Sequence, residues 1–128
     1  MDPADIVHLL SDLPSGGADE VVSLLLSAPG LRVDRIVSTG QASPPGFHYD
    51  QPHAEWVAVL AGSADLRFAD ETEPRRLIAG DAILIAPHRR HRVERTESPT
   101  VWLAIHFGAD VGGPEDRPEP LSQQTGRG

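Results

Sequence analysis

Short apolar runs that alternate with polar positions dominate the chain from residue 31 onward. Ala64, Leu66 and Phe68 alternate with Asp65 and Arg67, so an extended segment here would have one apolar face and one charged face. Gly, Pro, Asp or Ser residues separate the successive runs, and several runs are rich in β-branched residues. The pattern predicts seven strands, over residues 31–38, 55–61, 64–68, 75–78, 82–86, 91–94 and 101–107. Seven short strands at this spacing indicate a sandwich or a barrel.

The two ends of the chain have different patterns. Asp2 and Pro3 can start a short helix through the apolar positions that follow, and Asp19 and Glu20 can open a second helix that ends near Pro29. The last twenty residues lack a periodic apolar pattern, so they cannot offset the entropy lost on ordering. We therefore expect a helical N-terminal segment over 1–30, a β domain over 31–108 and a flexible tail over 109–128.

Composition and charge narrow the classes of function. A chain of 128 residues suits one domain, and the absence of cysteine excludes disulfides, thiolate metal sites and cysteine catalysis. The formal net charge of −8 would repel a phosphate backbone, so nucleic acid is not an expected partner. No apolar run reaches the roughly 18 residues that span a membrane, and the acidic N-terminus is unlike a signal peptide. We expect a cytoplasmic protein with no membrane partner.

Two segments carry histidines and carboxylates at the expected ends of strands. The first contains His48, Asp50, His53 and Glu55, with Gly62 at the seventh position after the glutamate. The second starts at Gly80-Asp81, continues through an apolar run and Pro87, and reaches His91. Imidazole and carboxylate groups on neighbouring strands are the donors that a mononuclear metal site needs.

These two segments resemble the paired motifs of the cupins. Glu55, Gly62, Gly80-Asp81 and His91 have the motif spacing, and His48 falls where the first motif histidine belongs. The chain departs from the motifs at several positions, which are Asp50 for the second histidine, Ala86 and His88 for a proline and a glycine, and Arg95 for an asparagine. The resemblance covers about residues 31 to 107. It implies a jelly-roll β-barrel, also called a double-stranded β-helix, closed around a pocket for a small molecule.

The sequence leaves two ligand sets open. If the motif alignment holds, His48, Asp50, Glu55 and His91 surround a metal. If a turn at Pro52 brings His53 inward, His53 replaces Asp50. Nitrogen and oxygen donors without sulfur suit divalent Fe, Mn, Ni or Zn.

Three other residues are candidates for the site. Tyr49 or Arg95 would orient a substrate, and the planar guanidinium of Arg95 could bind a carboxylate in two contacts. His106 points into the barrel if Leu103 and Ile105 face outward, and it points outward if those two fill the barrel.

The leading hypothesis is a metal-dependent enzyme that acts on a small oxygen-rich or carboxylated molecule. Dioxygenase, decarboxylase and isomerase reactions all occur in the resembled family. The alternative is a non-catalytic cupin that binds or senses a small molecule, because Asp50 and Arg95 depart from the motifs. A homodimer is expected, since an N-terminal strand exchanged between protomers is one way to cover sheet edges.

Overall fold

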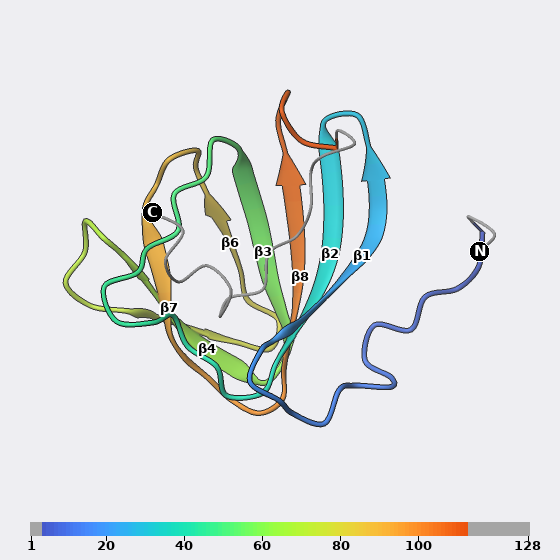
Figure 1. The fold of residues 1–128 in the computed structure, drawn as a ribbon, viewed down its shortest axis with the longest axis horizontal. Helices are drawn as coiled ribbons and strands as arrows, with labels where there is room; N and C mark the ends of the chain where they lie inside the picture. The colour runs from blue at the N-terminus through green and yellow to red at the C-terminus, as the bar shows by residue number, and fades with distance from the viewer. Residues whose placement is uncertain (1–3, 113–128) are drawn as a thin grey trace.

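The computed structural model describes residues 4–112 and contains two facing antiparallel sheets (Figure 1). Five strands form the larger sheet in the order β1-β2-β8-β3-β6, and three form the smaller sheet in the order β5-β4-β7. The bounds of the strands are β1 Val21–Ala28, β2 Leu31–Ser38, β3 Ala54–Ala61, β4 Ser63–Phe68, β5 Arg75–Ile78, β6 Ala82–Ile85, β7 His91–Thr96 and β8 Thr100–Phe107. The seven strands expected from residue 31 onward are all present, and the all-β double-stranded β-helix is confirmed.

The expected N-terminal helices are wrong for the described residues. Residues 4–112 contain no helix, and therefore none that could cross a membrane. The apolar run that suggested the second helix forms β1, which pairs with β2 from Val21↔Val37 to Ala28↔Leu31. Eight residues are too few for a stable isolated helix, whereas pairing with β2 satisfies their backbone groups.

The region after β8 is described only in part. Val111 is buried, and its carbonyl oxygen accepts a hydrogen bond of 2.8 Å from the backbone N–H of Gly30. Residues 109–112 of the expected tail therefore run back along the turn between β1 and β2. Asp2, Pro3 and residues 113–128 lie outside the described residues.

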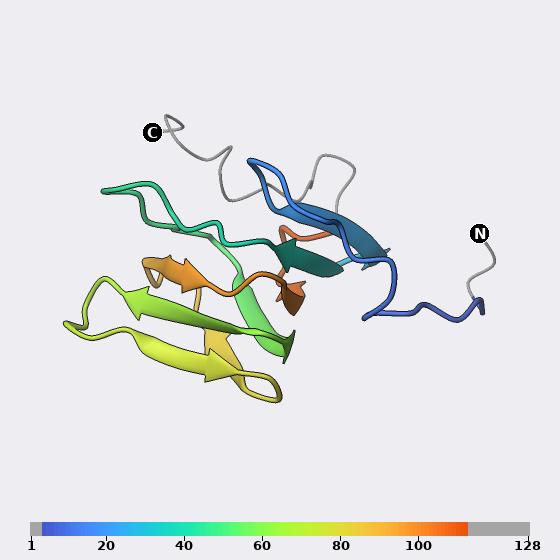
Figure 2. The ribbon, with the colours of Figure 1, turned by 90° about the horizontal axis from the view of Figure 1, so that it is seen from below.

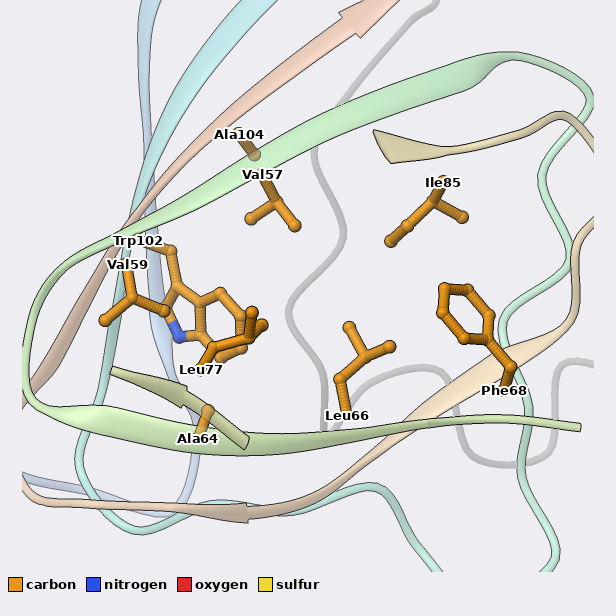
Figure 3. Packing of buried hydrophobic residues seen from close by; sticks show 9 residues of the cluster. All are labelled: Val57, Val59, Ala64, Leu66, Phe68, Leu77, Ile85, Trp102 and Ala104. Carbon is orange, nitrogen blue, oxygen red and sulfur yellow. The ribbon is translucent and has the colours of Figure 1, made fainter. Parts of the chain in front are cut away.

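The hydrophobic core lies between the two sheets. Alternate residues of β3 and β8 point toward alternate residues of β4 and β5, as the period of two in a strand requires. Figure 3 shows the nine buried side chains of this cluster, which are Val57, Val59, Ala64, Leu66, Phe68, Leu77, Ile85, Trp102 and Ala104. None of them comes from β1 or β2, and Figure 2 shows these two strands at the side of the molecule away from the smaller sheet.

The two ends of the space between the sheets differ in polarity. At the end where β3 finishes, Trp102 fills the space, and its indole Nε1 donates to Ser38 Oγ at 3.0 Å. Ser38 Oγ in turn donates to the carboxylate of Glu20 at 3.1 Å. At the opposite end, where β3 and β7 begin and β8 finishes, the inner faces carry buried histidine, carboxylate and arginine side chains. The candidate site lies at this polar end.

Candidate functional site

A row of ionisable side chains crosses the inner face of the larger sheet at its polar end. The strand register places Glu55 of β3 opposite His106 of β8, and His106 opposite Arg32 of β2. Asp34 lies two residues after Arg32 and so shares its face. All four residues are buried. The same alternation that points Val57 and Ala104 into the core therefore points these four groups into the polar end.

His106 contacts three of its neighbours at once. Its Nδ1 lies 2.9 Å from Nε2 of His53, and its Nε2 lies 3.7 Å from Asp34 Oδ2 and 3.9 Å from Glu55 Oε2. Asp34 Oδ2 also accepts a hydrogen bond of 3.0 Å from Arg32 Nε. Buried carboxylates need a counter-charge or hydrogen bonds, and here Arg32 and the imidazole of His106 are the neighbouring groups.

Two further contacts hold Glu55 and His53 in place. The amide of Gln51 donates to Glu55 Oε1 at 3.0 Å, so this oxygen is bound by protein while Oε2 faces His106. His53 Nδ1 lies 3.7 Å from a carboxylate oxygen of Asp110. Gly108 makes this approach feasible, because a Cβ there would lie 3.2 Å from the Cβ of His53. The segment after β8 thus closes over His53.

His91 occupies the start of β7 and is buried. Its backbone pairs with Tyr49, and the two rings stack with centroids 5.2 Å apart. Burial lowers the pKa of His91, while the hydrogen bond to Arg89 O and the charge of Glu55 act in the opposite direction. Because the Arg89 oxygen can only accept, Nδ1 of His91 carries the proton in this 2.8 Å bond and Nε2 is left as an acceptor.

The remaining expected site residues lie elsewhere. Asp50 contacts His88 Nδ1 at 2.8 Å, and both side chains are exposed. Arg95 donates to Asp65 at 3.3 Å and to Ser63 at 2.9 Å.

His48 lies in a basic environment. Its Nδ1 is buried without a hydrogen-bond partner among residues 4–112. Burial lowers the pKa of His48, and the charges of Arg90, Arg92 and Arg67 lower it further.

The structure brings only part of either expected ligand set together. Glu55 and His53 share one cluster, and the charge of Glu55 acts on His91, whereas Asp50 is turned toward His88. Within residues 4–112, no three histidine or carboxylate side chains are disposed to hold a metal ion. The donor types suit a divalent metal, but their placement does not fit one. The metal site stays a prediction.

His106 is the residue that the sequence left undecided. Leu103 and Ile105 lie on the outer face of β8, and His106 shares the inner face with Trp102 and Ala104. The inward alternative is therefore the one that the structure shows. The cue in the sequence is Trp102, which lies four residues before His106 and therefore on the same side of the strand, because a large apolar side chain usually faces the core.

The comparisons with known proteins agree with this fold. The family model described as Cupin domain matches residues 35–106, which is more than half of the chain. The chain belongs to the cupin family. No curated protein matches this cupin.

Several solved structures are similar to this cupin. One is a candidate mannose-6-phosphate isomerase from Ralstonia eutropha JMP134, with 47% identity over 82% of this chain and 99% of that chain and a TM-score of 0.79. A cupin superfamily protein from Desulfitobacterium hafniense DCB-2 is 14% identical over 82% of this chain and 93% of that chain, with a TM-score of 0.67. A protein with a double-stranded β-helix domain from Klebsiella pneumoniae is 17% identical over 84% and 92%, with a TM-score of 0.67. The last two support the fold alone.

Proposed function

We propose that the polar end of this cupin barrel binds a small oxygen-rich molecule and catalyses an isomerisation by proton transfer. The observation that carries the proposal is the buried pair of Glu55 and His106, whose Oε2 and Nε2 atoms lie 3.9 Å apart. A carboxylate and an imidazole at this separation can act on two adjacent atoms of one substrate. The similarity to a candidate sugar-phosphate isomerase supports this class of reaction.

The proposed step needs no reagent besides the substrate. Glu55 takes the proton from the carbon beside a carbonyl group, which gives an enediol, and returns it to the neighbouring carbon. His106 moves the hydroxyl proton from one substrate oxygen to the other, with His53 held against its Nδ1 at 2.9 Å. The products contain the same atoms and electrons as the substrate, so the step is balanced without an oxidant or a reductant.

His91 has a binding role in this proposal. With its proton on Nδ1 and bonded to Arg89 O, the ring presents Nε2 as an acceptor for a substrate hydroxyl group. Burial lowers the pKa of His91 and keeps the ring in this neutral form at pH 7. No step in the proposal passes through a metal, because the donors as placed do not converge.

Proton exchange with solvent tests the reaction directly. Hexose phosphates and small hydroxy acids would be incubated with the protein in D2O, and incorporation of deuterium at carbon would be followed by NMR. We expect Glu55→Gln to lose incorporation by the 10² to 10⁴-fold typical of a lost general base, while binding persists. Glu97→Gln is the matched control, since Glu97 is exposed and lies between β7 and β8, at the end of the barrel opposite to the polar end. Equal incorporation by wild type and Glu55→Gln would contradict the proposed role of Glu55.

A non-catalytic binding module is the second candidate. It is favoured by the bond from Gln51 to Glu55 Oε1 and the bond between His53 and His106, since both already engage the groups that would react. A compound that raises the melting temperature without deuterium incorporation or conversion would support this candidate over the isomerase.

A further inference from the structure

A row of basic side chains crosses the outer face of the smaller sheet, on the side away from the core. The register pairs Arg67 of β4 with Arg92 of β7. On the other side of β7, an antiparallel bridge joins Tyr49 to the buried His91, and their rings stack on the inner side. The adjacent pair in this register is His48 with Arg92, and alternation turns both outward. The three basic side chains are therefore direct cross-strand neighbours.

Arg90 extends this row toward the polar end. It lies two residues before Arg92, and its carbonyl oxygen accepts a hydrogen bond of 2.9 Å from the backbone N–H of Ala69, so it shares the outward direction of Arg92. Its side chain is exposed and makes no hydrogen bond or ion pair within residues 4–112. Asp50, its neighbour in register, contacts His88 instead at 2.8 Å. The basic cluster is defined below as His48, Arg67, Arg90 and Arg92.

The basic cluster has fewer acidic partners than guanidinium groups. Glu94 Oε2 accepts hydrogen bonds from Arg67 Nε at 3.2 Å and from Arg92 Nε at 2.8 Å, so one carboxylate serves two arginines. Three guanidinium groups against one carboxylate leave an excess of two positive charges, and like charges on neighbouring strands repel one another. Burial lowers the pKa of His48, and the charges of the three arginines lower it further. The local potential at His48 is therefore positive.

Two of the three guanidinium groups are already held in place. Arg92 Nη1 donates to the carbonyl oxygens of Pro44 and Phe47 at 3.0 and 3.2 Å, which ties it to the segment before β3. Arg67 is held through Glu94, while its Nη2 makes no hydrogen bond to any of the described residues. Side chains fixed in this way lose little further freedom when a ligand binds.

We propose that the basic cluster binds the phosphate group of a small soluble molecule. A phosphate monoester carries a charge of about −1.5 to −2 at pH 7 and has three strong acceptor oxygens, which guanidinium groups bind in pairs. This charge matches the excess of the cluster. Glu55 and His106 lie on the inner face of the larger sheet, so the phosphate site is separate from the groups of the proposed reaction.

A small ligand fits the charge distribution better than a long polyanion does. Asp50 lies two residues from His48, and Asp70 lies three residues from Arg67, so acidic groups border the cluster along the chain. A nucleic acid or an anionic membrane would extend beyond the cluster and meet these groups, as well as the repulsion of a chain with a formal net charge of −8. A single phosphate group stays within the cluster.

NMR titration of the full chain with inorganic phosphate, at pH 7.5 and constant ionic strength, tests the proposal. We expect the ring signals of His48 to shift with a Kd of about 1 mM or tighter, while those of His8 and His106 stay in place. Arg90→Gln should weaken this binding at least about tenfold, because it removes the guanidinium group whose donors are all open.

Arg76→Gln is the matched control for the loss of one positive charge. Arg76 lies on the outer face of the same sheet, but it is paired with Asp65 and is not part of the cluster. Its removal should change the Kd for phosphate by less than about twofold, because solvent and salt screen exposed charges. Neither arginine is buried, and far-ultraviolet circular dichroism would show that both variants are folded.

Vesicles separate a soluble phosphate from a lipid headgroup. Phosphatidylcholine vesicles that contain phosphatidic acid would be sedimented with the wild type and with Arg90→Gln. We expect no binding of either protein, and binding of the wild type that Arg90→Gln lost would overturn the proposal of a small soluble ligand. Three other results would overturn it as well, which are unshifted His48 signals at tens of millimolar phosphate, shifts at His106 instead, or equal phosphate affinity in Arg90→Gln and wild type.

Discussion

The imidazole rings of His53 and His106 meet at 2.9 Å, from Nε2 to Nδ1, although 53 positions separate them along the chain. His53 precedes β3 and His106 lies near the end of β8, and the pairing of these two strands places both rings at the polar end of the barrel. His106 also faces Asp34 and Glu55. It is therefore the residue through which the histidine pair and the buried carboxylates are linked.

Replacing His106 with leucine should destabilise the fold and abolish the proposed reaction. Asp34 and Glu55 would lose a polar neighbour while staying buried, at a cost of about 1–3 kcal/mol in the free energy of unfolding. Urea denaturation measures this free energy. His88→Asn is the control, because His88 is exposed and has a positive φ of 61°, which asparagine tolerates. Equal stability of the two variants would contradict the central position of His106.

Acid should destabilise the protein partly through His91. Burial lowers the pKa of His91 below 6.5 in the folded state, so the unfolded chain binds more protons as pH falls through 6.5. The stability that the neutral ring of His91 contributes is present in full above that pH, and it is lost as the pH falls toward the lowered pKa of the folded state. Urea denaturation at pH 7 and at pH 5 should show a smaller loss in the free energy of unfolding for His91→Gln than for wild type. If the free energy of unfolding fell equally with pH in the variant and the wild type, this contribution of His91 would be ruled out.

Metal content tests the remaining ligand prediction. The sequence prediction of a metal site requires that protein purified without a chelator or a histidine tag carries a divalent transition metal. It also requires that His91→Ala weakens metal binding far more than the 10 to 100-fold typical of an outer-shell change. Glu55 and its neighbours would have to reorient, since no three donors converge in residues 4–112. His88→Asn should keep the metal. Less than about a tenth of an equivalent in the wild type, with no binding on titration, would contradict the prediction.

Gly62 should tolerate no side chain. Its φ is +82°, and a Cβ would overlap the carbonyl oxygen of Pro99 and lie 2.6 Å from Thr100 Oγ1. Gly80 has a φ of +97° but open space around it, so Gly80→Ala isolates the backbone strain, about 1–2 kcal/mol. We expect Gly62→Ala to lose at least about 2 kcal/mol more than Gly80→Ala in urea denaturation, because the steric overlap adds to the strain. Similar losses would mean that the loop around Pro99 relaxes at little cost.

The sequence predicted the barrel well and the start of the chain poorly. The alternation in β4 follows from the period of a strand, and the spacing of Gly62, Gly80 and His91 was read from the resemblance to the cupin motifs. The structure agrees with both. The apolar run of β1 has no clear period, so its sequence is compatible with either a helix or a strand. Only its pairing with β2 decides between them, because the partner strand supplies the backbone hydrogen bonds.

The candidate site, too, was predictable from the sequence only in part. The sequence by itself determined that Glu55 and His91 lie at the ends of strands, because the turn residues that precede them along the chain interrupt the strands locally. It could not determine that His106 faces Glu55, Asp34 and His53, or that Asp50 turns toward His88. Those contacts depend on the register between strands far apart in the chain, and a shift of one residue in that register would turn His106 to the opposite face.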